Sequence, residues 1–367
     1  MADCIRLLER CALSGDMGGL ADLAGKEQWL AMEQGAIDDG VAGWMYWHCM
    51  RSGFVLPERV ERQWQHLYRH YAGSNLAALC RLEQVLGVFA ERGIDALVLP
   101  GAPLLSLYPD LVYLSMDDVD LLVRADSMGA FADLLHHLGY VSPTRHPDIF
   151  ASDELVLDVH IDLFHNERVA ARRFTGSLPI EGIWERRSIK EVGGFELYCI
   201  SAEGAAIYSA VHVLRHSFRR LNWFIDLHLL FAHEVDAMQL IQRSECASLQ
   251  RPLLYELRFL QGSVELPPAL AAWSREQRIY GVEGWFMRRA WADRQHNELG
   301  DVLWSFSIGS FARRLYFILQ TLFPRPAVLM QVFPFLPAPL FPLAYLLRLV
   351  QLLLRGGRQL VSMVRKH

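Results

Sequence analysis

The sequence predicts an α+β fold in which a small mixed sheet is flanked by helical regions on both sides along the chain. Apolar residues recur at helical spacing before Gly93, short apolar runs alternate with one helix as far as residue 200, and helical spacing returns at Ser201. We therefore expect four regions: helical residues 1–92, a sheet core over 93–200, helical residues 201–304, and an apolar, basic C-terminal arm over 305–367.

Composition narrows the class of protein. The 367 residues are enough to bury a full core, and 52% of them are hydrophobic. A net charge of −5 argues against a nucleic-acid-binding surface, so we expect no sequence-specific nucleic acid partner. The six cysteines are scattered without a C-x-x-C pair, which argues against a zinc site or a disulfide framework. Because the first residues lack a signal-peptide pattern, we expect a cytoplasmic protein.

The helix that leads into the sheet core is predicted by apolar residues three or four positions apart, and Gly93 is its expected end. These apolar residues are Leu76, Leu79, Leu82, Val85, Leu86 and Phe89.

Three strands are predicted in the sheet core, over residues 96–99, 119–123 and 155–164. The third alternates strictly, so Leu157 and Val159 face one side of the sheet while Asp158 and His160 face the other.

Two further elements complete the predicted core. A helix over residues 127–138 begins with Ser127 as its N-cap, and a hairpin over residues 189–200 turns at Gly193 and Gly194. Beyond the core, helices are predicted from Ser201 to about residue 216, over residues 222–233, and onward to about residue 304.

The C-terminal arm has an unusual composition. From residue 302 to the end there is no Asp or Glu, and an uncharged stretch separates Arg325 from Arg348. Five prolines between residues 326 and 342 make a single spanning helix improbable, while residues 341–354 can form an apolar helix. Two interpretations stay open: the arm packs on the core or on a second subunit, or it anchors the protein at an anionic inner membrane face.

Asp118 and Asp120 are the first candidate metal ligands. Side chains two positions apart on a strand share a face, about 6 to 7 Å apart along the strand. Two carboxylates in this arrangement repel each other unless a cation lies between them, and hard oxygen ligands are those a divalent cation prefers.

Asp158 on the next strand and Gly101 in a nearby turn complete the candidate site. Three carboxylates from two adjacent strands can build a two-metal centre for phosphoryl transfer. Gly101 lets the backbone approach phosphate oxygens closely and offer N–H donors. The chain contains neither a P-loop nor a G-x-G-x-x-G motif.

With these elements in order, the chain resembles the uncharacterised nucleotidyltransferase family of bacteria, within the polymerase-β-like nucleotidyltransferase superfamily. The likeness extends from about residue 29 to residue 354. The segments that carry it are Leu99-Pro100-Gly101-Ala102-Pro103, Tyr108-Pro109, Asp118-Val-Asp120-Leu-Leu-Val123, Gly139-Tyr140, Asp158-Val-His160 and Arg219-Arg220-Leu-Asn-Trp223-Phe-Ile-Asp226-Leu227.

The resemblance implies a nucleotidyltransferase-like sheet core that transfers a nucleoside monophosphate from an NTP with Mg²⁺ or Mn²⁺. Asp118, Asp120 and Asp158 would be the catalytic metal ligands, and Gly101 and Ala102 would hold the triphosphate. The acceptor is a sugar, a peptide or a small molecule. We expect His160 either to orient the metal ligand Asp158 through a hydrogen bond or to be a buried histidine of the core.

Two positions depart from the family pattern. The lysine before the glycine is Pro100 here, and the arginine upstream of the acids is Leu114 or Ser115. The missing charges favour an alternative, a degenerate nucleotide- or metal-binding partner protein in a biosynthetic system, associated with a membrane through its arm. Candidates to replace the charges are Arg124, Arg145, Arg215, Arg219 and Arg220.

Asp226 lies in an apolar helix beside Trp223. We expect it to be a buried partner of Arg219 or Arg220, with a contact to nucleotide as the alternative.

Overall fold

The computed structural model describes most of the chain. The described residues are 2–23, 25–111, 116, 118–143, 148–164, 170–294, 297–333, 336 and 343–351. Leu114, Ser115 and Arg145, together with the end of the arm from residue 352, lie outside them.

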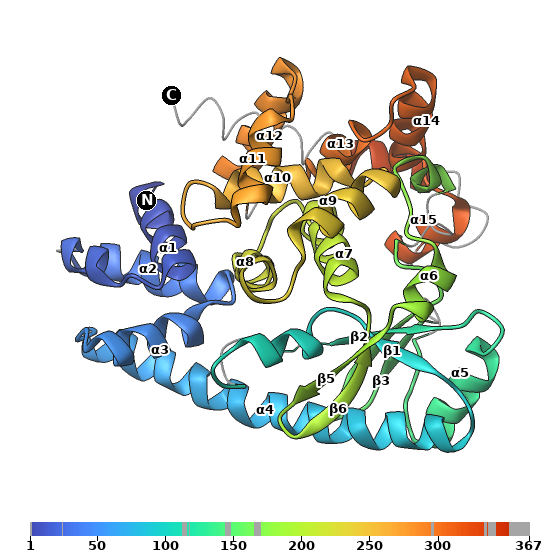
Figure 1. Ribbon diagram of the computed structural model, residues 1–367, viewed down its shortest axis with the longest axis horizontal. Coiled ribbons are helices and arrows are strands. Elements are labelled where there is room, and N and C mark those ends of the chain that lie inside the picture. Colours follow the sequence, from blue (N-terminus) through green and yellow to red (C-terminus); the bar gives the residue numbers. More distant parts are fainter. Residues whose placement is uncertain are drawn as a thin grey trace.

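A six-stranded mixed sheet with strand order β3-β4-β2-β1-β6-β5 forms the centre of the fold (Figure 1). The strands are β1 (Ala96–Val98), β2 (Val119–Val123), β3 (Ile149–Ala151), β4 (Val156–His160), β5 (Ser188–Val192) and β6 (Phe195–Cys199). β2 runs parallel to β4 and antiparallel to β1, β1 runs parallel to β6, and β5 and β6 form an antiparallel hairpin. The sheet and its flanking helices confirm the predicted α+β class.

Helical segments precede and interrupt the sheet along the chain. These elements are α1 (Ala2–Ser14), η1 (Gly18–Asp22), α2 (Lys26–Asp38), α3 (Ala42–Ser52), α4 (Glu58–Glu91), η2 (Ala102–Leu107), α5 (Met128–His137), η3 (Ala170–Phe174) and α6 (Ile180–Glu185). The long α4 runs beneath the strands in Figure 1, and its Phe89 stacks on Phe131 of α5 with ring centroids 4.0 Å apart.

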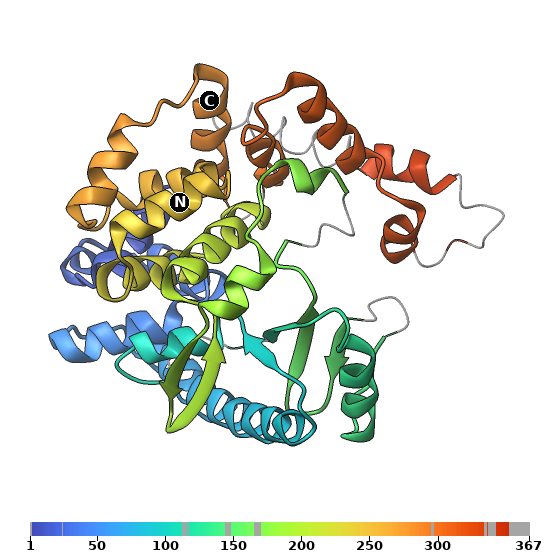
Figure 2. The same ribbon diagram turned by 45° about the vertical axis from the view of Figure 1, so that its right-hand side comes forward.

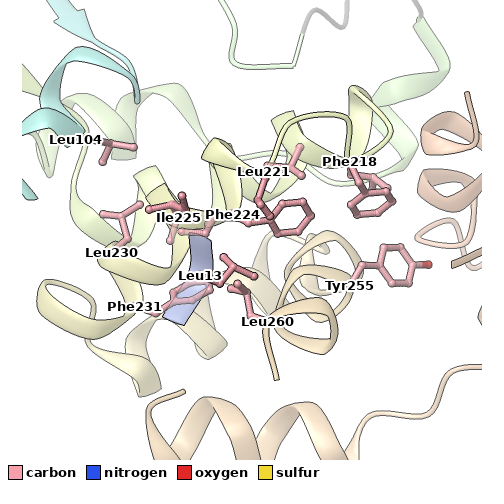
Figure 3. Close-up of a cluster of buried hydrophobic side chains, with 14 of the residues drawn as sticks. Leu13, Leu104, Phe218, Leu221, Phe224, Ile225, Leu230, Phe231, Tyr255 and Leu260 are labelled. Atoms are coloured by element: carbon pink, nitrogen blue, oxygen red, sulfur yellow. The ribbon is translucent and has the colours of Figure 1, made fainter. Parts of the chain in front are cut away.

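Helices that follow the sheet gather on the opposite face, where α7 and α8 lie above the strands in Figure 1. They are α7 (Ala202–Arg215), α8 (Asn222–His233), α9 (Ala237–Cys246), α10 (Gln250–Leu260), α11 (Pro268–Glu276), α12 (Gly281–Ala292), α13 (Gly300–Ser305), α14 (Phe311–Leu322) and α15 (Pro326–Val332). Figure 3 shows how Phe224, Ile225 and Leu230 of α8 pack with Leu13 of α1 and Leu260 of α10.

The sheet separates two hydrophobic cores, which its side chains fill alternately. Val119, Leu121 and Val159 pack into the smaller one with α4 and α5, here called the α4-side core. Leu122 packs into the larger one with α7 and α8, here called the helical core. Because α1, α2 and α3 also contribute to the helical core, the first and third predicted regions share one interior. The division into four regions stays a prediction.

A buried arginine links these two regions. Arg294, which follows α12, donates two hydrogen bonds to Asp39 after α2 and one to Glu9 of α1. Asp39 is fully buried, so the pair compensates two charges that would each be costly to bury alone.

Several predicted boundaries are confirmed. β2 has the predicted bounds, the β5–β6 hairpin turns at Gly193 and Gly194, and α4 ends within two residues of Gly93. Ser201 caps α7 as predicted, accepting a hydrogen bond from the backbone N–H of Gly204.

The prediction of a strand over residues 155–164 was wrong for residues 161–164, which lie outside the strand. β4 ends at His160, and Asp162 then accepts a hydrogen bond from the backbone N–H of Phe164 at 2.8 Å. This local bond competes with the ladder. Leu163 and Phe164 both enter the helical core, which two consecutive strand residues do not do. β3 has no counterpart among the predicted strands.

The described part of the arm is helical. α14 packs against η3 and α13, and a helix over residues 343–351 packs with α15 in a small cluster of its own. In the part of the chain that the structure describes, no helix combines the length and the apolar character needed to cross a bilayer.

Candidate active site

Two acids face each other across neighbouring strands. The parallel register of β2 and β4 pairs Asp120 with Asp158. Because both positions alternate with residues of the α4-side core, both carboxylates point to the opposite face, toward α7. Their side chains keep 18% and 24% of their surface exposed, so a ligand can still reach them.

His160 at the end of β4 joins this pair. Its Nε2 donates to Asp120 Oδ1 at 3.0 Å and lies 3.7 Å from Asp158 Oδ1. One ligand atom from each of the three residues lies within 4.8 Å of the other two, close enough to share a metal ion. The histidine is 3% exposed and contacts Asp120 more closely than Asp158, the residue that it was expected to orient.

α7 supplies a second hydrogen-bond donor to Asp120, in addition to His160. The buried Tyr208 hydroxyl donates to Asp120 Oδ2 at 3.2 Å. The two residues are 88 positions apart, so this contact ties the helical region to the sheet.

The protonation of the pair follows from these contacts. Burial alone would raise the pKa of Asp120, but the hydrogen bond and positive charge of His160 hold that pKa below its ordinary value. Burial opposes the charged form of His160 too, and the hydrogen bond to Asp120 outweighs it and raises the histidine pKa. The geometry thus favours an ionised carboxylate beside a protonated imidazole.

Further along α7, two more histidines follow Tyr208 at intervals of four residues. The rings of His212 and His216 are tilted by 40° with centroids 4.5 Å apart, and Trp223 of α8 lies edge-on to His212 at 5.0 Å. Burial, with the nearby Arg215, lowers the pKa of His212 to about 4 and that of His216 to about 3. Both rings are therefore neutral at pH 7, and Arg215 brings the positive charge to this end of the helix.

The Gly101 turn lies close to the start of β2, which carries Asp120. The backbone N–H of Leu99 donates to the Asp120 carbonyl at 2.9 Å, and Gly101 follows two residues later. Gly101 has φ +139° and ψ −98°, a backbone conformation that residues other than glycine rarely adopt. A Cβ atom at this position would meet no other atom within 4 Å. The backbone conformation requires the glycine and leaves open space beside it. Ala102 is buried and packs into the α4-side core.

The structure brings Asp120, Asp158 and His160 together. Asp118 is exposed directly before β2 and stands outside this group of described residues. Sequence analysis named Arg215 among the candidate arginines but missed Tyr208. The one signal for Tyr208 is that polar side chains recur at helical spacing along the otherwise apolar α7, which does not show what they contact.

The donor set fits a divalent cation. Carboxylate oxygens suit Mg²⁺ and Mn²⁺. Asp120 and Asp158 offer such oxygens on partly exposed side chains, and a protonated His160 behind them compensates their charge and is not a donor to the ion.

Two motif segments far apart in the sequence are in contact. Tyr108, at the end of η2, donates from its hydroxyl to Asp226 Oδ1 of α8 at 2.6 Å. Arg219 was one of the two arginines expected to pair with Asp226, but its guanidinium lies 3.9 Å from the Glu298 carboxylate instead. The carboxyl is buried, and burial raises its pKa to about 7 despite the hydrogen bond from Tyr108. Asp226 therefore secures the loop after Gly101 to the helical core.

A mixed sheet with paired acids beside a glycine turn is the arrangement expected of a nucleotidyltransferase, and the family match below shows that class of transferase. The chain belongs to the uncharacterised nucleotidyltransferase family, whose model matches residues 25–262. The match begins close to the expected start and ends well before residue 354, so the arm lies outside it. No curated protein matches the chain.

Several solved structures also match. One is the antibiotic-resistance factor ANT(2'')-Ia, with 14% identity and a TM-score of 0.32 over 46% of this chain and 92% of that one. Another is an antigenic nucleotidyltransferase-like protein from Paracoccidioides brasiliensis, with 16% identity and a TM-score of 0.31 over 54% of this chain and 95% of that one.

Metal binding tests the acid pair. We expect Asp120→Asn and Asp158→Asn each to weaken Mn²⁺ binding by at least about tenfold, because each removes a charged oxygen ligand. Titration calorimetry or electron paramagnetic resonance of Mn²⁺ measures this. Asp162→Asn is the matched control: its amide oxygen still accepts from Phe164, and binding should be unchanged. Equal losses in all three variants would rule out a site at the pair.

Asp226 makes the stability of the protein depend on pH. Folding raises its pKa, so the folded state holds the proton more tightly, and the resulting stability is full below about pH 4 and lost as pH rises through about 7. In Asp226→Asn the amide oxygen still accepts from Tyr108 but does not ionise. The free energy of unfolding of the wild type, measured with urea relative to this variant, should fall by a few kcal/mol between pH 4.5 and 8. A difference that is constant with pH contradicts the assignment.

Proposed function

We propose that the protein transfers a nucleoside monophosphate from an NTP to an acceptor hydroxyl or phosphate, with Mg²⁺ or Mn²⁺. The observation that carries the proposal is the β2–β4 register, which places Asp120 and Asp158 side by side with His160 on one sheet face. Family membership supports an NTP as the donor.

Asp120 and Asp158 would hold the cation. The exposed Asp118, which directly precedes β2, would be a further carboxylate ligand. A bound divalent cation supplies charge neutralisation for the phosphates and lowers the pKa of a bound hydroxyl. His160 contacts both paired acids from the protein interior, where it fixes their orientation and compensates their charge.

The reaction forms one bond at the α-phosphorus and breaks another. The acceptor oxygen attacks this atom, the bond to the bridging oxygen of the pyrophosphate breaks, and pyrophosphate leaves with the electron pair. Asp158 helps remove the acceptor proton. Backbone N–H groups at Gly101 and Ala102 hold the triphosphate, and the open space beside Gly101 supports this role.

The phosphates also need positive charge, which Pro100 does not supply. Among the candidate arginines that the structure describes, Arg215 is the one whose charge acts on His160, Tyr208 and His212. By contrast, the guanidinium of Arg124 lies over the Trp184 ring at 4.5 Å, and Arg219 is half exposed beside Glu298. We assign Arg215 to the triphosphate.

Pro100 also favours a second candidate function. A chain that lacks the family lysine could bind an NTP without turning it over and act as a nucleotide-binding partner in a biosynthetic system. The two candidates differ in turnover alone, so one measurement of binding and one of transfer separate them.

Transfer is tested with the full chain, Mg²⁺, NTPs labelled at the α-phosphate and extracts that contain sugars, peptides and small molecules. The wild type and Asp162→Asn should label an acceptor and release pyrophosphate, whereas Asp120→Asn should be slower by about 10² or more, because it loses a ligand of the cation. NTP binding without any labelling would favour the partner protein over the enzyme.

Binding is tested with an NTP whose α,β-bridge is a methylene, so that no transfer occurs. Titration calorimetry should show that Arg215→Ala weakens binding by roughly 10- to 100-fold, the value of a charge-assisted hydrogen bond to phosphate. Arg219→Ala is the control on the same segment, and its affinity should match the wild type. If both variants bind equally well, another group serves the phosphates.

A further inference from the structure

Several large apolar side chains of the arm are exposed to solvent. On α14, Phe311, Leu315 and Leu319 are 77%, 47% and 45% exposed, and their spacing of four residues puts them on one side of the helix. Phe317 on the other side is buried in the helical core. α14 therefore packs on the helical core through the side that carries Phe317, and its exposed apolar side takes no part in that packing.

The rest of the described arm repeats this arrangement. Leu329, Phe333 and Ala344 pack against one another in their own cluster, while Met330 of α15 and Leu346 of the 343–351 helix stay exposed. In Figure 2 the segment that contains α14 and α15 stands out from the body at the upper right. We call this exposed surface of α14, α15 and residues 343–351 the arm face.

The charge of the arm is opposite to that of the body. Residues 302–367 contain eight basic residues and no Asp or Glu, although the whole chain has 36 basic and 41 acidic residues. The basic residues are Arg313, Arg314, Arg325, Arg348, Arg355, Arg358, Arg365 and Lys366. An anionic surface would attract the arm and repel the remainder of the protein.

We propose that the arm face docks on an anionic phospholipid surface and lies in the interface. Exposed leucine, phenylalanine and methionine side chains would enter the boundary between headgroups and acyl chains, and the net positive charge of the arm would attract the lipid phosphates. The apolar contribution and the charge contribution act together, and stable peripheral binding generally needs two such signals.

A second copy of the chain fits the arm face less well. Two arms would bring eight basic residues each into one contact with no acidic residue of either arm to neutralise them. Lipid phosphates provide that neutralisation. The charge pattern therefore favours a membrane surface over self-association.

The test uses the full chain and sedimentation with vesicles. We expect binding to vesicles of phosphatidylcholine mixed with phosphatidylglycerol, and little binding to phosphatidylcholine alone. Raising the salt from about 0.1 to 1 M, which shortens the Debye length from about 10 to about 3 Å, should weaken it. Equal binding to both vesicle types, or none, would overturn the proposal.

The triple variant Phe311→Ser, Leu315→Ser, Leu319→Ser should lose at least about tenfold in vesicle affinity. Val55→Ser, Ile189→Ser, Met238→Ser is the matched control, since it removes three exposed apolar side chains outside the arm. Circular dichroism and urea unfolding verify that both fold. Equal effects of the two triples contradict the assignment. Light scattering that shows a dimer broken by the arm triple alone would assign the face to a second copy.

Discussion

The parallel pairing of β2 with β4 is the constraint on which the candidate site depends. Its register sets Asp120 opposite Asp158, and the pleat sends both carboxylates to the same face as His160. A slip of one strand by a single residue would turn its acid into the α4-side core, among Val119, Leu121 and their neighbours. The apolar residues that alternate with the acids therefore fix the fold and the site together.

Placing two acids on a sheet face that is covered by helices is costly unless they are compensated. The Tyr208 hydroxyl and the His160 imidazole provide that compensation for Asp120, and a bound cation would complete it. α7 is thus part of the site although it lies in a different predicted region. The contact between Tyr108 and Asp226 ties α8 to the loop after Gly101 in the same way. Both contacts explain why the helical core and the sheet act as one unit.

Much of this could be predicted from the sequence, because local patterns decide it. Alternation predicted which face Asp158 and His160 share, and the capping serine and paired glycines predicted the start of α7 and the hairpin turn. The end of β4 depends on a hydrogen bond from one loop residue to another, which competes with the ladder and leaves no periodic signal. Tyr208 could not be found because its partner is 88 positions away and no local pattern encodes that distance.

We propose that Asp120 and Asp158 hold a divalent cation that serves an NTP. A crystal structure with Mn²⁺ and the methylene-bridged NTP would decide this, because the anomalous signal of Mn²⁺ locates the ion directly. We expect an anomalous peak between the two carboxylates, with the triphosphate against the Gly101 turn and within reach of Arg215. A triphosphate bound elsewhere, or a peak that lies away from both acids, would contradict it.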